Sequence, residues 1–232
     1  MKKLICILLF FPLLNCGNER VVQLPEIENA KITEVVDVSP AYIFYDDTQP
    51  DSTLFNRKNL ISTTNWLVNV DKRLTLKQVI PYIQYLQNKR KKTSMHKNEN
   101  AKNYFTCNDI SIGNLGFVEF TNIDYSNGLS TSRMKVISQL YFDKIFIHPE
   151  IKNKNTIHIF IRNDNSFELK TITYTDFNQH IDLIQRNNTK DSLIILLNFD
   201  KNLSFQDYIR FKSINSDLDI NGVRIDANES IY

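Results

Sequence analysis

The histidines and acidic residues of this chain do not stand at spacings that would support a metal site or a catalytic centre. None of the histidines is placed with another histidine, a cysteine or a glutamate as metal ligands usually are. No G-x-S-x-G nucleophile motif and no glycine-rich phosphate loop occur. The sequence therefore predicts no catalytic residue, no metal ligand, no cofactor and no enzyme. The alternative is a periplasmic hydrolase whose site is assembled from distant residues. Its candidates are Asp200, His158 and His180.

Cys16 is the residue with the clearest chemistry, because it ends an apolar N-terminal run. Two lysines precede the run Leu4–Leu14, which is the layout of a secretory leader. The run is shorter than the roughly 20 apolar residues that a spanning helix needs. The segment Leu13–Cys16 resembles the lipobox of bacterial lipoproteins, although Asn15 stands where that family prefers glycine or alanine. The resemblance implies that Cys16 carries fatty-acyl chains such as palmitate. The alternative is an ordinary signal peptide with an incidental cysteine.

The charge argues against a nucleic-acid-binding protein, and the cysteine content argues against a disulfide within the mature chain. The net charge is only +2, and acids and bases are interspersed, which is not the concentrated basic face of a nucleic-acid-binding protein. The one basic cluster, Lys89–Lys92, is expected to end a helix, where cations complement the helix dipole. With Cys6 removed and Cys16 acylated, Cys107 has no partner for a disulfide and is expected to be a small buried residue.

Two segments of similar sequence lie 129 residues apart, Asn69–Leu76 and Asn198–Phe205. Each reads as the end of a strand, a tight turn and the start of a capped helix. The expected capping pairs are Thr75 with Gln78 and Ser204 with Asp207. The turn aspartates, Asp71 and Asp200, are candidate partner-binding residues, and the alternative is that they only build the turn.

Short strands and amphipathic helices alternate around these motifs, which predicts an α/β (α+β) fold with helices packed on mixed sheets. We expect two related ββαβ(αβ)-type sandwich modules. The helix that begins after Thr75 contains Pro81, so a kink or break is expected there. The next helix is expected to be capped by Thr175. Strands are expected at residues 42–45, 66–70, 116–120, 157–161, 167–172, 193–197 and 223–225, and the last helix at residues 204–217.

The C-terminal third of the chain resembles the periplasmic domain of the ExbD/TolR biopolymer-transport proteins. The resemblance rests on the strand 157–161 with its turn at 163–165, the helix after Thr175, the strand 193–199 with Asp200, and the closing helix and strand. Residues 66–86 look like a partial second copy. The family implies a small dimeric domain that contacts cell-wall or energised-membrane partners. Its members also carry an intramembrane aspartate for proton flow, whereas Leu4–Leu14 contains no acid. The resemblance therefore implies only the soluble binding module.

These observations give a domain layout and a functional hypothesis. The expected layout is a leader over 1–16, a tether over 17–40, an N-terminal module over 41–135 and a C-terminal ExbD/TolR-like module over 136–232. We expect a non-enzymatic lipoprotein of the cell envelope that faces the periplasm. Its expected partners are the membrane, a protein or cell-wall partner accessory to biopolymer transport, and a second copy of the chain, but no nucleic acid.

Overall fold

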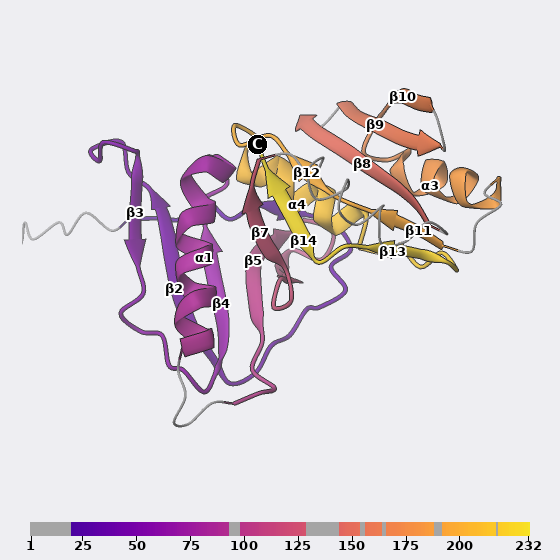
Figure 1. Ribbon diagram of the computed structural model, residues 1–232. Coiled ribbons are helices and arrows are strands. Elements are labelled where there is room, and N and C mark those ends of the chain that lie inside the picture. The colour runs from indigo at the N-terminus through magenta and orange to yellow at the C-terminus, as the bar shows by residue number, and fades with distance from the viewer. Residues whose placement is uncertain are drawn as a thin grey trace, which may run out of the picture.

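Two mixed β-sheets with helices packed on them form the part of the chain that the structure, a computed structural model, describes. The described residues are 20–92, 98–128, 144–153, 156–163, 166–187, 192–216 and 218–232. Figure 1 shows the two sheets side by side, with the C-terminus of the chain between them. The predicted mixed α/β fold is thus confirmed.

The first sheet belongs to the N-terminal module and runs in the order β1-β5-β4-β2-β3, with β6 paired to β5. Helix α1 lies across one face of this sheet (Figure 1) and buries the apolar side of its turns against it. The bounds are β1 Glu26–Ile27, β2 Val38–Tyr45, β3 Thr53–Asn56, β4 Asn65–Val70, α1 Leu76–Lys92, β5 Asn103–Asp109 and β6 Asn114–Glu119.

The second sheet runs in the order β10-β9-β8-β12-β14-β7. Strand β11 also pairs in parallel with β8 and with β13. Helices α3 and α4 pack side by side, since the rings of Phe177 and Phe211 lie 5.3 Å apart. The bounds are β7 Asp124–Asn127, β8 Lys144–Asn153, β9 Thr156–Asn163, β10 Ser166–Ile172, α3 Phe177–Arg186, β11 Ser192–Ile195, β12 Asn198–Phe199, α4 Phe205–Ile214, β13 Val223–Ile225 and β14 Asn228–Ile231.

Several local predictions differ from the structure. Helix α1 continues unbroken through Pro81, because its buried face holds it on the sheet despite the missing N–H. The N-cap of α3 is Asp176 rather than Thr175, and it makes no side-chain capping bond. Six of the described strands were not predicted: β1, β3, β5, β7, β8 and β14. Part of the turn expected at residues 163–165 lies outside the described residues.

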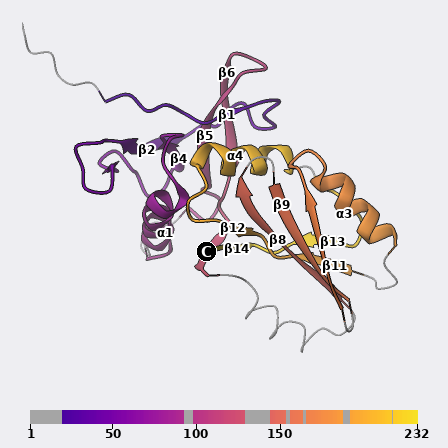
Figure 2. The same cartoon turned by 90° about the horizontal axis from the view of Figure 1, so that it is seen from above.

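The two modules share one hydrophobic core. Phe105 of β5 stacks on Phe120 at 3.9 Å between ring centroids and meets Phe205 of α4 edge-on at 5.1 Å. Strand β7 falls within the range expected for the N-terminal module, yet it pairs with β14 of the second sheet. Figure 2 shows α4 lying between the two sets of strands. The modules are therefore packed as one body rather than joined by a free linker.

The segment expected to be a tether is packed against the first sheet from Arg20 onward. The N–H of Lys72 donates to the carbonyl of Gln23 at 2.8 Å, and β1 pairs in parallel with β5. The N–H of Ala30 donates to Asp109 Oδ2 at 2.6 Å. These bonds correct the tether prediction, because residues 20–37 have partners along the sheet and do not act as a spacer.

Gly116 of β6 is a point of close approach between this segment and the sheet. A Cβ there would lie 2.5 Å from the Cβ of Ala30 and 3.0 Å from Cδ1 of Ile27. We expect Gly116→Ala to lower the free energy of unfolding by about 1–3 kcal/mol through overpacking. Hydrogen exchange at the amide of Ala30 should speed up, while the exposed Leu115→Ala should leave it unchanged. Unaltered exchange in Gly116→Ala would contradict the packed placement.

Candidate functional site

The two copies of the repeat pair with each other and form what we call the repeat interface. The N–H of Leu76 donates to the carbonyl of Leu203 at 3.0 Å, and the N–H of Phe205 donates to the carbonyl of Leu74 at 2.6 Å. Each bond is the equivalent of the other, because residues 76 and 205, and likewise 74 and 203, are 129 positions apart. The two copies are therefore related by a local two-fold axis. Thr75 and Ser204, which are equivalent, form a β-bridge at its centre.

A second pair of bonds obeys the same relation. The N–H of Lys77 donates to the carbonyl of Lys201 at 2.8 Å, and the N–H of Gln206 donates to that of Lys72 at 3.3 Å. The first N–H groups of a helix have no acceptor inside the helix. Here the starts of α1 and α4 each find acceptors in the turn of the other copy. The repeat therefore fixes how the two modules are joined.

Side-chain capping completes each helix start, with a different half of the capping box in each copy. In the first copy the Oε1 atom of Gln78 accepts the N–H of Thr75 at 2.8 Å. In the second the hydroxyl of Ser204 accepts the N–H of Asp207 at 3.1 Å. The predicted pairs are thus confirmed, but the hydroxyl of Thr75 donates to Oε1 of Gln78 at 2.8 Å and accepts no bond from a helix N–H among the described residues. The shorter side chain of Asp207 accepts from the Ser204 hydroxyl instead of from its N–H.

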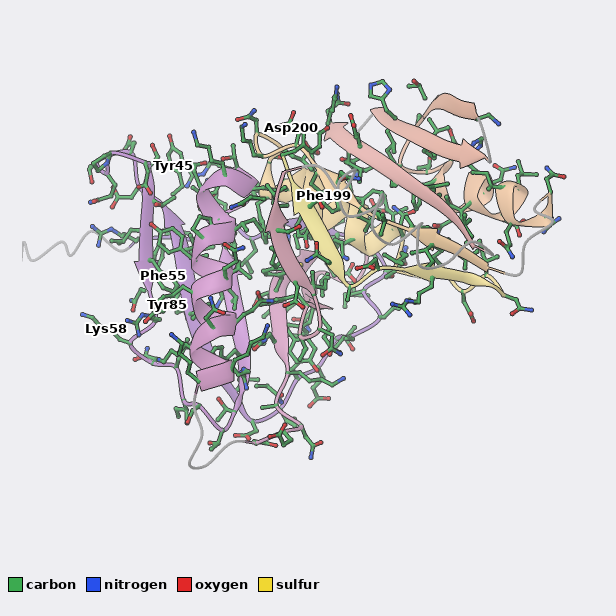
Figure 3. All side chains as sticks on the ribbon, viewed as in Figure 1. Tyr45, Phe55, Lys58, Tyr85, Phe199 and Asp200 are labelled. Carbon is green, nitrogen blue, oxygen red and sulfur yellow. The ribbon has the colours of Figure 1, made fainter. Side chains whose placement is uncertain are left out.

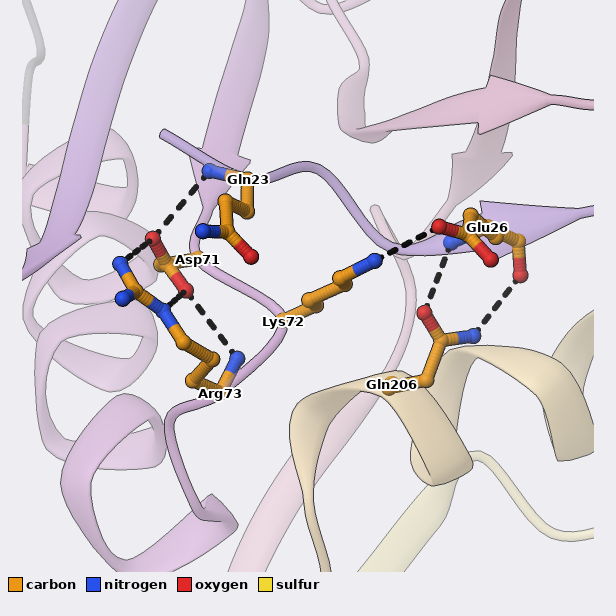
Figure 4. Close-up of polar contacts among 6 residues, drawn as sticks. All are labelled: Gln23, Glu26, Asp71, Lys72, Arg73 and Gln206. Atoms are coloured by element: carbon orange, nitrogen blue, oxygen red, sulfur yellow. Dashed lines mark hydrogen bonds and ion pairs between the residues drawn. The ribbon is translucent and has the colours of Figure 1, made fainter. Parts of the chain in front are cut away.

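Asp71 is a buried structural carboxylate and not a contact for an external partner. Its residue exposure is 0 %. Arg73 donates two side-chain bonds to it, each 2.8 Å long, and the N–H groups of Arg73 and Gln23 donate at 3.1 and 3.2 Å (Figure 4). Burial by itself would raise the pKa of Asp71, but these donors together lower the pKa below its usual value. The partner-binding hypothesis is therefore wrong for Asp71, because its oxygens face inward and are occupied.

Asp200 differs from Asp71 because its turn lacks the arginine. Asn202 stands where Arg73 stands in the first copy, and its N–H donates to Asp200 at 2.8 Å. Asp200 is partly exposed at the end of the strand that carries Phe199 (Figure 3). It therefore stays a candidate contact residue.

Glu26 ties the N-terminal segment to both copies of the repeat. Its carboxylate pairs with the ammonium of Lys72 at 2.6 Å. Its N–H and carbonyl bond the side-chain amide of Gln206, both at 2.8 Å, as Figure 4 shows. The N-terminal segment is therefore held across the junction of the two modules.

A groove lies next to this junction, between the N-terminal segment with β6 on one side and α4 with β13 and β14 on the other. We call it the inter-module groove. Its cavity measures about 430 Å³, and most of its lining is apolar. Both features are typical of binding pockets, which place a few polar groups among hydrophobic walls. Apolar lining residues include Ile27, Ile32, Phe117, Val118 and Ile225, and polar ones include Lys212, Asn215 and Glu229.

A buried polar network forms the base of the groove and joins α4 with strands β14 and β7 of the second sheet. Lys212 of α4 pairs with Glu229 of β14, whose residue exposure is 1 %. The hydroxyl of Tyr208 donates to Glu229 at 2.8 Å and lies 3.0 Å from the hydroxyl of Tyr125 on β7. Burial, the main cause, and the charge of Glu229, the second cause, raise the pKa of both tyrosines well above the usual value. Both hydroxyls therefore stay protonated.

Asn215 adds a second polar feature to the groove. It is 5 % exposed, and its side-chain N–H donates to the carbonyl of Phe211 at 2.8 Å. Its Oδ1 atom is buried and accepts no hydrogen bond among the described residues. A buried acceptor without a donor is unfavourable, so a bound partner that shifts the side chains over this atom and donates to it would satisfy it.

The remaining candidates from the sequence do not converge on the groove. The Nδ1 atom of His158 on β9 lies 3.1 Å from the hydroxyl oxygen of Thr171, and His180 lies on α3. Neither histidine lines the groove, and Asp200 does not line it either. Cys107 is 0 % exposed, and burial raises the pKa of its thiol. Cys16 and the leader lie outside the described residues.

The sequence did not predict a role for Lys212, Glu229 or Asn215. A lysine and an asparagine three residues apart in a helix share one face, but the pattern does not show that this face is covered. Glu229 stands near the end of the chain with no apolar alternation around it. Only the packing of β14 beside α4 reveals these residues.

No group of three or more potential metal ligands occurs among the described residues. Within the same residues, no helix has the length and apolar character to cross a membrane. Comparisons with protein-family profiles, with curated proteins and with solved structures gave no significant match.

Proposed function

We propose that this chain is a non-enzymatic lipoprotein of the cell envelope that faces the periplasm and binds a protein or cell-wall partner in the inter-module groove. In this proposal acyl chains on Cys16 hold it to a membrane, and it serves as an accessory of a biopolymer-transport assembly. The observation that carries the binding role is the groove itself, with apolar walls, a buried ion pair at its base and an unsatisfied acceptor on Asn215.

The chemistry of the groove favours a partner that presents an apolar group next to a hydrogen-bond donor. The walls offer hydrophobic contact, and Asn215 Oδ1 offers an acceptor. A side chain flanked by a peptide N–H has both properties, as do peptide segments of proteins and of the cell wall.

The repeat interface bears on the homodimer that the ExbD/TolR resemblance implies. The first N–H groups of α1 and α4 already bond to each other's turns within one chain. A homodimer would therefore have to use a surface other than the repeat, and in our proposal the repeat serves as an internal equivalent of the dimer contact.

Replacement of Cys16 by serine tests the anchor. We expect native protein to incorporate labelled fatty acid and to sediment with membranes until detergent is added. Cys16→Ser should incorporate no label and should lose membrane association by more than tenfold, since no acyl chain remains to partition into the bilayer. Equal membrane association of the two forms, with no label in either, would remove the anchor from the proposal.

A second experiment tests the groove. Asn122 is exposed at its rim, so Asn122→Trp should narrow the opening without changing the core. Native protein cross-linked in membranes and purified in detergent should carry a partner in a fixed ratio, and Asn122→Trp should lose it. The matched control is Asn100→Trp, at an exposed position that does not line the groove. Equal recovery with both variants would rule out the groove as the binding site.

A further inference from the structure

The surface around β3 carries positive charge that the groove does not explain. A shallow hollow of about 570 Å³ lies beside this strand. Four basic side chains and no acidic one line it among the described residues, and we call them the basic surface: Arg20, Arg57, Lys58 and Lys89. Strand β3 ends the first sheet and pairs there with β2.

Aromatic side chains accompany the basic surface. The rings of Phe55 and Tyr85 lie 6.1 Å apart, and the guanidinium of Arg57 lies 4.6 Å from the centre of the Tyr85 ring. Tyr85 is 42 % exposed. Figure 3 shows Phe55 and Tyr85 next to each other, with Lys58 projecting from the outer edge of the module. Tyrosine beside lysine and arginine is a composition suited to the headgroup region of a bilayer.

The position of Arg20 links this surface to the anchor. Arg20 pairs with Asp46 at 3.3 Å, which holds this part of the chain at the edge of the first sheet. Cys16 stands only four residues earlier. Four residues span at most about 14 Å. If Cys16 is acylated, as proposed above, the lipid must enter the bilayer close to the basic surface.

The geometry points to the basic surface of β3 as a membrane-contact surface that binds the negatively charged headgroups of phospholipids in the anchoring bilayer. This inference rests on the proposed lipid anchor and adds an orientation to it. Basic residues near an anionic leaflet are attracted to it over about one Debye length. Strand β3 lies at one end of the molecule, with α3 and β10 at the other (Figure 1). The C-terminal module is therefore directed away from the membrane.

The test uses the full acylated chain in vesicles of phosphatidylcholine, with or without 30 % phosphatidylglycerol. One fluorophore is attached at Asn59→Cys beside the basic surface, and in a separate sample at Leu183→Cys on α3, which is 47 % exposed. Cys107 is fully buried and should not react, and Cys6 is replaced by alanine in both samples. Energy transfer to a headgroup-labelled lipid reports the distance of each site from the bilayer.

We expect at least threefold stronger transfer from Asn59→Cys than from Leu183→Cys in vesicles with phosphatidylglycerol. The double substitution Arg57→Glu/Lys58→Glu should abolish most of that difference, and so should 0.5 M salt. The control Lys201→Glu/Arg224→Glu makes the same change in net charge on exposed residues of the C-terminal module and should leave the difference intact.

The outcomes separate this inference from the proposed function. Vesicle-bound protein with equal transfer from both labels would overturn the membrane-contact surface and leave the anchor standing. Stronger energy transfer from Asn59→Cys that Arg57→Glu/Lys58→Glu does not reduce would also overturn the membrane-contact surface. This holds even if the double variant loses an acidic protein partner. If the purified full-length protein carries no acyl chains and does not bind the vesicles, both the lipid anchor and the membrane-contact surface would be overturned.

Discussion

Lys212→Ala is expected to lower the free energy of unfolding by about 3–5 kcal/mol, because it leaves the carboxylate of Glu229 buried without its counter-ion. Glu229 is 1 % exposed and the side chain of Lys212 18 %, so little water can replace the ammonium. The hydroxyl of Tyr208 still donates to Glu229 at 2.8 Å, but a single neutral donor does not balance a buried charge. Urea unfolding followed by circular dichroism measures the change.

Two comparisons separate the buried charge from the loss of a long side chain. Lys91→Ala removes an ion pair with Asp124 whose side chains are 68 % and 61 % exposed, and it should cost less than about 1 kcal/mol. Lys212→Met/Glu229→Gln removes both charges and keeps an acceptor for Tyr208, so it should recover most of the loss. A cost for Lys212→Ala no larger than that for Lys91→Ala would show that Glu229 is hydrated.

The parts of the fold that could be predicted from sequence are those fixed by local chemistry. The pattern around Thr75 and Ser204 predicted strand, turn and capped helix, because capping depends on residues three positions apart. The continuous apolar run Leu193–Leu197 predicted a fully buried strand, and each of its residues is buried, although the strand β11 ends at Ile195. The mutual pairing of the two copies could not be predicted, since each backbone bond joins residues far apart in the sequence.

The two longest of the missed strands broke the rules that identify strands from sequence. Strand β8 contains Pro149, which lacks an N–H for the ladder and argues against a central strand. Strand β5 has polar residues at buried positions, among them Asn103 and Asp109, so it shows no apolar alternation. Asp109 is accommodated because the hydroxyl of Ser111 and the N–H of Ala30 donate to it. Ser111 is a local donor, but Ala30 lies 79 residues away in the sequence, so the sequence pattern could not show that Asp109 is buried with its oxygens satisfied.

The tether was misassigned for a related reason. Residues 20–37 have no sustained apolar period because they run along the edge of the first sheet and the junction of the modules, held mainly by backbone and polar bonds. Periodicity reports a face that packs on a core. It does not report a segment whose partners are carbonyls, carboxylates and amides of other elements.

The two equivalent aspartates provide the second large expected effect, with its control in the same chain. Asp71→Ala should lower the free energy of unfolding by about 2–4 kcal/mol, because it removes the two bonds from the side chain of Arg73 and two backbone bonds. The estimate is below that for Lys212→Ala because the side chain of Arg73 is 41 % exposed and can be hydrated. Asp200→Ala removes the bond to the N–H of Asn202 at a partly exposed turn and should cost less than about 1 kcal/mol. Equal costs would mean that the arginine in the first copy adds nothing to the turn.

The stabilisation by Asp71 should also depend on pH in a defined direction. Since its pKa is lowered in the folded protein, the unfolded chain takes up the proton first as the pH falls. The contribution is therefore fully present above the unfolded-state pKa of about 3.9 and is lost as the pH falls through the lower pKa of the folded state. The gap in unfolding free energy between native protein and Asp71→Asn should stay constant from pH 7 to about pH 5 and shrink below about pH 4. A gap that widens in acid would mean that burial outweighs the arginine and the backbone donors at this carboxylate.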